Sequence, residues 1–164
     1  MSTPNMIDIP AAWYGKDMLK DTSSWMYSLT PADIAELEAA AKSFKDSGKP
    51  LGLISSELFP LKEFGNFLRQ LQTDLSKGSG FKLISGLPVS SYDADFYATI
   101  FCGMGSHLGS ARSQNAAGHL LGHVRDVGAD INNPNTRIYQ TTARQSFHTD
   151  SCDVVGLLCL KEAK

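Results

Sequence analysis

Two stretches in the first half of the chain carry apolar residues at the spacing of an amphipathic helix. In the first, Thr30 can cap the helix and Pro31 suits its first turn. Apolar residues then recur every three or four positions as far as Phe44, until a Gly-Lys-Pro sequence ends the run. The second stretch spans 62–77, and its apolar stripe consists of Phe64, Phe67, Leu68, Leu71 and Leu75. We expect both stripes to face a hydrophobic core.

A third helix and two strands follow from shorter patterns. Ser90 or Ser91 can cap a helix that continues to about His107, with apolar residues on one side and Gly109 after its end. Residues 81–85 predict a strand, because they are bounded by glycines and a Gly-Leu-Pro turn follows them. The continuous apolar run 154–160 suits a buried strand.

The remaining segments show no clear period. Residues 1–29 mix aromatic with polar side chains, and we interpret them as an irregular arm that its aromatic residues anchor to the rest of the domain. Residues 51–59, between two prolines, allow a brief strand or a loop. Residues 110–135 are rich in Gly, Asn and Asp, which is typical of a long loop with short strands.

Composition limits the class of protein. The chain has 164 residues, of which 42% are hydrophobic and 20% charged, and this suits one globular domain over 1–164. A net charge of -2 gives no general attraction to nucleic acid or to an anionic membrane. Without an apolar run of about 18 residues or a signal-like N-terminus, we expect a cytoplasmic protein. The three cysteines have no zinc spacing and are interpreted as buried free thiols.

The strongest candidate for chemistry is the sequence Phe147-His148-Thr149-Asp150. In an extended backbone alternate side chains share a face, so His148 and Asp150 project together. An imidazole and a carboxylate form two thirds of the facial triad that holds non-haem Fe(II). His148 and Asp150 are therefore predicted to be metal ligands, with Asp153 as a fallback carboxylate that would need a partner in an apolar strand.

Other motifs are weaker. The glycines of 103–109 come at a helix end and do not open a helix after a strand, which disfavours a phosphate-binding loop. His119 and His123 have the i, i+4 spacing of a zinc site, but no Glu follows the first His, and two glycines weaken the helix. We expect His123 and its neighbours to form an extended segment at the mouth of a pocket. Gln140 and Arg144 are candidates for contacting a polar or anionic substrate, as is Arg137.

The order of two of these motifs resembles a known family. Two motifs are similar to the taurine dioxygenase (TauD/TfdA) family. One is Phe147-His148-Thr149-Asp150, followed by a strand that ends Leu-Leu-Cys-Leu, and the other is the upstream Gly-Phe-x-Leu-x-x-Gly-Leu-Pro of 80–88. The resemblance covers about 50–164. It implies an α+β fold, a double-stranded β-helix (jelly roll) with flanking helices. The arm is then 1–29, the helices and first strand are 30–107, and the start of the jelly roll with the metal motif is 108–164.

The resemblance also implies a reaction. It predicts an Fe(II)- and 2-oxoglutarate-dependent dioxygenase that uses O2 to hydroxylate or oxidatively cleave a small organic substrate, with release of succinate and CO2. In that family the second iron-binding His and the Arg that binds 2-oxoglutarate lie well over a hundred residues after the first motif. We therefore expect a chain truncated before the later barrel strands, with little or no turnover as 164 residues.

Two alternatives stay open. The chain could be a catalytically silent domain or an interaction module, since missing strands would leave sheet edges and apolar surface uncovered. It could also be a cupin-like isomerase or hydrolase, which would use a metal without 2-oxoglutarate. The resemblance selects neither a substrate nor an oligomeric state.

Overall fold

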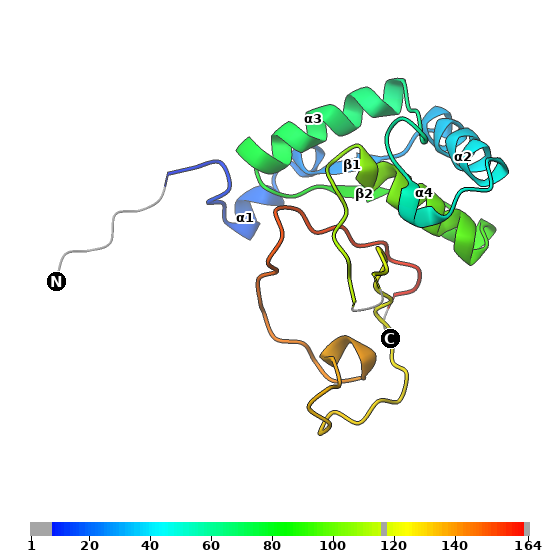
Figure 1. Ribbon diagram of the computed structural model, residues 1–164. Helices are drawn as coiled ribbons and strands as arrows, with labels where there is room; N and C mark the ends of the chain where they lie inside the picture. The colour runs from blue at the N-terminus through cyan, green and yellow to red at the C-terminus, as the bar shows by residue number, and fades with distance from the viewer. Residues whose placement is uncertain (1–7, 116–117, 163–164) are drawn as a thin grey trace. The chain divides into compact units, whose positions relative to one another are not determined.

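The computed structural model describes residues 8–115 and 118–162. Its main elements are α1 (Gly15–Met18), β1 (Met26–Ser28), α2 (Pro31–Asp46), α3 (Glu63–Lys77), β2 (Leu83–Ser85) and α4 (Ala94–Ser106) (Figure 1). Four 3-10 turns join them, η1 (Thr22–Ser24), η2 (Leu51–Leu53), η3 (Val89–Ser91) and η4 (Ile138–Gln140). The chain divides into two compact units. Arg112–Leu157 forms the second unit, and the described residues on either side of it form the first.

Helix α2 begins where the sequence predicts. Thr30 is the N-cap, its hydroxyl accepts a hydrogen bond from the Asp33 backbone N–H, and the Asp33 carboxylate accepts one from the Thr30 N–H. This reciprocal capping box satisfies two backbone donors that a helix start would otherwise leave unpaired. The Tyr27 hydroxyl also donates to Asp33, over 2.9 Å, so the residues before the helix are tied to its first turn.

Helix α3 also matches its predicted stripe, with Phe64, Leu68 and Leu71 buried. Its N-cap residue, Lys62, has no side chain able to accept a hydrogen bond, and the cap comes from another helix. Glu36 of α2 accepts hydrogen bonds from the backbone N–H groups of Lys62 and Phe64, the latter over 3.1 Å. A carboxylate at this position also faces the positive end of the helix dipole.

Removing this inter-helix cap should weaken the first unit. We expect Glu36→Ala to lower the free energy of unfolding by about 1–2 kcal/mol, as lost caps do, with urea unfolding as the measurement. Glu36→Gln keeps an oxygen acceptor and loses only the charge, so its loss should be smaller. Equal losses in the two variants would contradict a cap in which hydrogen bonding dominates.

Helix α4 begins later than predicted. Ser90 and Ser91 lie in the η3 turn, Tyr92 is extended, and the N-cap is Asp93, whose carboxylate accepts from the Phe96 N–H over 2.7 Å. The serine prediction was wrong because the Gly-Leu-Pro turn continues into η3, which uses both serines before the helix can start.

The segment before α2 contains a strand that no period indicated. β1 pairs in parallel with β2, with Met26 opposite Leu83 and Ser28 opposite Ser85. The aromatic anchoring predicted for this arm is observed. Trp13 and Trp25 both pack against the Phe81 ring, and the indole N–H groups donate to backbone carbonyls of Ser79 and Met18 respectively.

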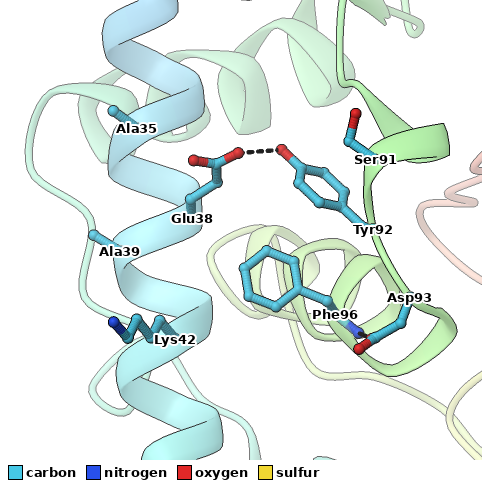
Figure 2. A pocket seen from close by; sticks show the side chains of 8 residues that line it. All are labelled: Ala35, Glu38, Ala39, Lys42, Ser91, Tyr92, Asp93 and Phe96. Carbon is cyan, nitrogen blue, oxygen red and sulfur yellow. Dashed lines mark hydrogen bonds between the residues drawn. The ribbon is translucent and has the colours of Figure 1, made fainter.

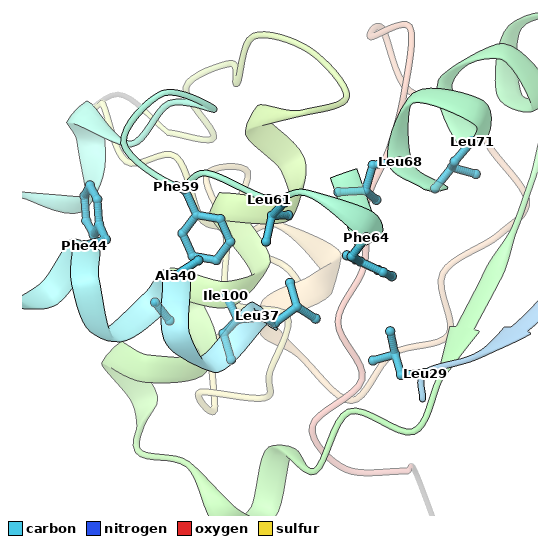
Figure 3. Close-up of a cluster of buried hydrophobic side chains, with 11 residues drawn as sticks. Leu29, Leu37, Ala40, Phe44, Phe59, Leu61, Phe64, Leu68, Leu71 and Ile100 are labelled. Atoms are coloured by element: carbon cyan, nitrogen blue, oxygen red, sulfur yellow. The ribbon is translucent and has the colours of Figure 1, made fainter. Parts of the chain in front are cut away.

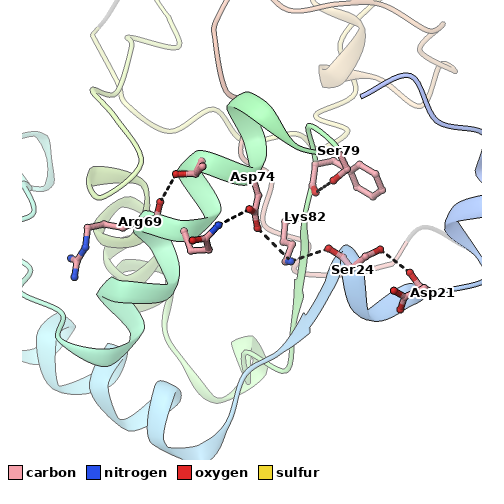
Figure 4. A network of polar contacts seen from close by, with 9 residues as sticks. Asp21, Ser24, Arg69, Asp74, Ser79 and Lys82 are labelled. Atoms are coloured by element: carbon pink, nitrogen blue, oxygen red, sulfur yellow. Dashed lines mark hydrogen bonds and ion pairs between the residues drawn. The ribbon is translucent and has the colours of Figure 1, made fainter. Parts of the chain in front are cut away.

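Lys82 joins three parts of the first unit (Figure 4). Its ammonium donates to the Ser24 carbonyl over 3.1 Å and lies 4.0 Å from the Asp74 carboxylate of α3. The side chain is largely buried, so its aliphatic stem packs while its charge is shared between these two partners. The contact connects η1, α3 and the segment leading into β2.

The core of the first unit joins α2, α3, α4 and the segment before α3 (Figure 3). Its largest fully buried side chains are Phe59, Phe64, Leu37, Leu68 and Ile100. Each such burial contributes roughly 1.5–3 kcal/mol. Gly103 of α4 faces the Phe59 ring so closely that an added Cβ would come within 2.5 Å of it.

The second unit has little regular structure in its described part. The Arg125 and Val127 N–H groups donate to the carbonyls of Tyr139 and Gln140, which lays 125–127 beside η4. Several large apolar side chains of this unit are exposed, and Phe147 is fully so. None of the helices in the described ranges is long and apolar enough to cross a membrane.

The strand predicted for 154–160 does not form in the structure. These residues have no regular secondary structure, and Val155 and Leu157 are exposed. An apolar run has the propensity for a strand, but a strand also needs a neighbour that pairs with its N–H and C=O groups. No such neighbour pairs with these residues in the described part of the chain.

Candidate metal centre

His148 and Asp150 lie next to each other in the second unit, as their spacing predicts. Residues 144–150 have no regular secondary structure, and the His148 Nε2 and Asp150 Oδ1 atoms are 3.9 Å apart. The side chains are 48% and 52% exposed. Both side chains are therefore about half exposed, and their donor atoms lie close to each other.

The hydrogen bonds of the His148 ring determine which nitrogen carries the proton. Nδ1 lies 2.9 Å from the Ser146 carbonyl oxygen, which can only accept, so Nδ1–H is the donor. In the neutral ring Nε2 is then unprotonated, and the Gln145 side-chain amide, 3.2 Å away, donates to it. A backbone carbonyl on one nitrogen commonly fixes the tautomer whose other nitrogen binds a metal.

The donor set fits part of a metal site. Metal bonds to imidazole nitrogen and carboxylate oxygen are about 2.0–2.2 Å long, so two donors at adjacent positions of a facial triad lie about 3 Å apart. The His148 Nε2 and Asp150 Oδ1 atoms are 3.9 Å apart, so the two side chains would have to rotate slightly toward each other to hold one ion. Among residues 8–115 and 118–162, no group of three or more His, Cys, Asp or Glu side chains converges to hold an ion. The pair supplies two ligands, and a third must be added to complete a facial triad.

The other metal candidates from the sequence lie elsewhere. His119 Nδ1 is 2.9 Å from the Asn115 amide nitrogen, and His123 is exposed. Asp153 is exposed, so water solvates its carboxylate and the partner that a buried strand would demand is not needed.

The cysteines only partly match their prediction. Cys102 is half-buried in α4, and burial raises the pKa of its thiol to about 11, which makes it unreactive. The prediction of buried thiols was wrong for Cys152 and Cys159, which are exposed. Both follow the metal motif, and Cys159 lies in the segment where the expected strand is absent.

The two predicted substrate residues differ in availability. The Gln140 side-chain oxygen accepts from the Arg137 N–H over 3.1 Å, so it is used within the η4 turn. Arg144 is exposed and forms no hydrogen bond or ion pair within the described part of the chain, which leaves its guanidinium available for an anion. Both roles stay predictions.

A hollow of about 380 Å³ lies in the same unit as His148. It is lined by backbone and side chains of Asp126, Gly128, Ala129, Asp130, Ile131, Thr141, Thr142 and Ala143. Asp126 and Asp130 each accept a hydrogen bond from a backbone N–H two residues later, which accounts for one oxygen of each carboxylate. The lining residues end one position before Arg144.

A larger hollow, of about 530 Å³, lies in the first unit between α2 and Ser91–Phe96 (Figure 2). Here the Tyr92 hydroxyl donates to Glu38 over 2.6 Å, and burial together with this bond raises the pKa of Tyr92. The tyrosine therefore stays protonated, and the pair binds the two elements together. The residues that line this hollow include no His or Cys, so His148 and Asp150 remain the candidate centre.

Sequence reasoning missed Gln145 and Ser146 as partners of His148. They are the third and second residues before it, and between 140 and 147 only Gln140 and Arg144 were predicted to have a role. The signal available was the amide at i−3, but whether that side chain reaches the ring depends on the course of the backbone between the two residues. A hydrophobic period does not encode that course.

Comparisons with known proteins give two relatives, while no family model matches the chain. FR-33289 synthase of Streptomyces rubellomurinus is 30% identical over 147 residues, which cover 89% of this chain and 43% of that protein. A taurine hydroxylase-like protein of Stachybotrys chartarum is 30% identical over 159 residues, covering 93% of this chain and 41% of that protein. The chain spans less than half the length of these curated relatives. They confirm the resemblance found from the sequence: the chain is similar to the N-terminal part of these two proteins, one of which is named for its likeness to a taurine hydroxylase.

Proposed function

We propose that the chain forms part of an Fe(II)- and 2-oxoglutarate-dependent dioxygenase in which His148 and Asp150 are two of the iron ligands. The observation that carries this proposal is the 3.9 Å distance between His148 Nε2 and an Asp150 carboxylate oxygen, with His148 Nδ1 bonded to the Ser146 carbonyl, on a motif that resembles the family. An imidazole and a carboxylate are ligands that Fe(II) takes in oxygenases, with positions left open for other ligands.

The chain's own residues would bind and orient. The Ser146 carbonyl holds the His148 ring in the Nδ1–H tautomer, so that Nε2 is available without a proton being lost. Arg144, four residues before His148, would attract a carboxylate or sulfonate of a small substrate. When bound, iron with 2-oxoglutarate and O2 supplies the oxidising chemistry.

The fold that goes with this function is the jelly roll with flanking helices. The resemblance supports it, since the motif-bearing segment of the family leads into a barrel. The α+β first unit is compatible with the flanking part. In this proposal the exposed apolar residues that follow the motif would be covered by further strands.

Metal binding tests the proposed ligands. We expect the chain to bind Co(II), used as a spectroscopic substitute for Fe(II), with a visible absorption band that saturates on titration. His148→Ala and Asp150→Ala should each weaken this binding at least about tenfold, since even partners of the ligands alter metal affinity by 10–100-fold. The measurement is the absorption titration under anaerobic conditions.

The matched control is His119→Ala, which removes an exposed histidine of the same unit that is bonded to Asn115. Its titration should match that of the unmodified chain. Fe(II) absorption with and without 2-oxoglutarate then separates this proposal from a cupin-like isomerase or hydrolase, because only the oxygenase is expected to respond. Binding that survives both ligand substitutions would contradict the assignment.

A further inference from the structure

We propose that Gln145 is a positioning residue whose side-chain amide is hydrogen-bonded to Nε2 of His148 and must rotate away when a metal binds to that nitrogen. The inference rests on the proposed function and extends it to a residue that the family motif does not contain. It starts from the hydrogen bond between the Gln145 amide nitrogen and His148 Nε2, over 3.2 Å.

The contact at Nδ1, the other ring nitrogen, shows which atom is the donor in this bond. The Ser146 carbonyl requires Nδ1 to carry the proton, so Nε2 presents a lone pair, and only the amide NH2 of Gln145 can pair with it. Both contacts favour the same tautomer, one at Nδ1 and the other at Nε2. Gln145 therefore stabilises, without a metal, the ring form that a metal would require.

The same geometry makes the amide a competitor of the metal. The unprotonated Nε2 of an imidazole has one lone pair, in the plane of the ring, and an amide donor and a metal ion cannot both use it. Gln145 is exposed and is held by no other described contact, so rotation of its side chain is enough to release the nitrogen. Asp150, on the same side of His148, is the second group that an incoming ion would meet.

The expected size of the effect is modest. A net hydrogen bond of this kind corresponds to about a two- to tenfold change in an equilibrium constant. Removing the amide should therefore tighten Co(II) binding by about two- to tenfold. A supporting residue that merely kept the loop folded would give the opposite change, namely weaker binding.

The experiment compares Gln145→Ala and Gln145→Leu with the unmodified chain in the Co(II) titration. Leucine keeps much of the side-chain volume and removes the donor, so both variants should bind more tightly. Gln114→Ala is the control, because that glutamine lies in the same unit and bonds to the Arg112 carbonyl and not to His148. It should leave the affinity unchanged. Unchanged or weaker binding in both Gln145 variants would overturn the inference.

A second measurement needs no metal. Nitrogen-15 NMR of the His148 ring should show the Nδ1–H tautomer in the unmodified chain, and a changed Nε2 signal in Gln145→Ala with the tautomer retained by the Ser146 carbonyl. An Nε2 chemical shift that is the same in both proteins would contradict the hydrogen bond from Gln145. If neither the unmodified chain nor any variant binds Co(II) through His148, both the proposed function and the role of Gln145 are contradicted. If binding depends on His148 but is the same with and without Gln145, only the role of Gln145 is contradicted.

Discussion

Replacing Gly103 with alanine is expected to destabilise the first unit by about 1–2 kcal/mol. An added Cβ would lie 2.5 Å from the Cγ and Cδ2 atoms of Phe59, well inside van der Waals contact. The ring cannot easily retreat, because Phe59 is fully buried, its N–H donates to Ser55 and its carbonyl accepts from His107 Nε2 over 2.8 Å. Overpacking of this kind costs about 1–3 kcal/mol, more than the 0.5–1 kcal/mol that alanine contributes to a helix.

Urea unfolding followed by tryptophan fluorescence measures this loss, since Trp13 and Trp25 both pack in the first unit. Gly105→Ala is the matched control in the same helix, because nothing lies within 4 Å of a Cβ there. It should raise the free energy of unfolding by up to about 1 kcal/mol. If Gly103→Ala stabilised the protein as Gly105→Ala does, the close packing of α4 against Phe59 would be wrong.

Asp33→Ala should lower the free energy of unfolding by about 3 kcal/mol. One oxygen of this buried carboxylate accepts hydrogen bonds from the Thr30 N–H, the Thr30 hydroxyl and the Tyr27 hydroxyl, over 2.7 to 2.9 Å. The substitution removes half of the capping box and leaves the tyrosine hydroxyl without its acceptor. A lost cap costs about 0.5–2 kcal/mol, and a hydrogen bond to a charged group contributes about 1.5–3 kcal/mol.

The same carboxylate should make stability depend on pH. Partial burial raises the pKa of Asp33, but the hydrogen bonds from Thr30 and Tyr27 outweigh it and hold the pKa below its ordinary value of 3.8. The folded state therefore binds this proton less tightly than the unfolded state, and stability falls as the pH drops from about 5 through the folded pKa. The stability difference between the unmodified chain and Asp33→Asn should shrink over that range.

Asp46→Asn provides the control for this titration, because Asp46 is the last residue of the same helix and is exposed. A negative charge at a helix C-terminus is unfavourable, so its removal should be neutral or slightly stabilising at pH 7. A pH profile of Asp33→Asn that runs parallel to that of the unmodified chain would show that Asp33 does not carry the dependence.

The three long helices could be predicted because each is encoded locally. Apolar residues at a period of 3.6 define the buried faces of α2 and α3, and the Thr-Pro-x-Asp start of α2 contains its own cap. The start of α4 was misplaced because three residues before it could all serve as caps, namely Ser90, Ser91 and Asp93. Which of them does so depends on where the preceding turn ends.

Pairing over long distances could not be predicted. β1 and β2 are three residues each and are separated by more than fifty residues, so neither carries a readable pattern for the other. The cap of α3 comes from Glu36, one helix earlier, and nothing in the sequence around Lys62 indicates it. The contact between Gly103 and Phe59 could not be predicted either. From the sequence alone a glycine inside a helix only lowers helix propensity, and its packing role appears once its neighbour is known.

In the candidate centre, too, the sequence predicted some features and not others. By itself the sequence determined that His148 and Asp150 share a face, because alternation along an extended backbone is a local property. It also determined the buried faces of α2 and α3 and the resemblance to the family. Only the tertiary structure decided which proton the His148 ring carries, that Gln145 lies on its free nitrogen, and that 154–160 is unpaired. The first two depend on the course of the backbone between 145 and 148, and the third depends on a pairing partner elsewhere in the chain. No short pattern of residues encodes either.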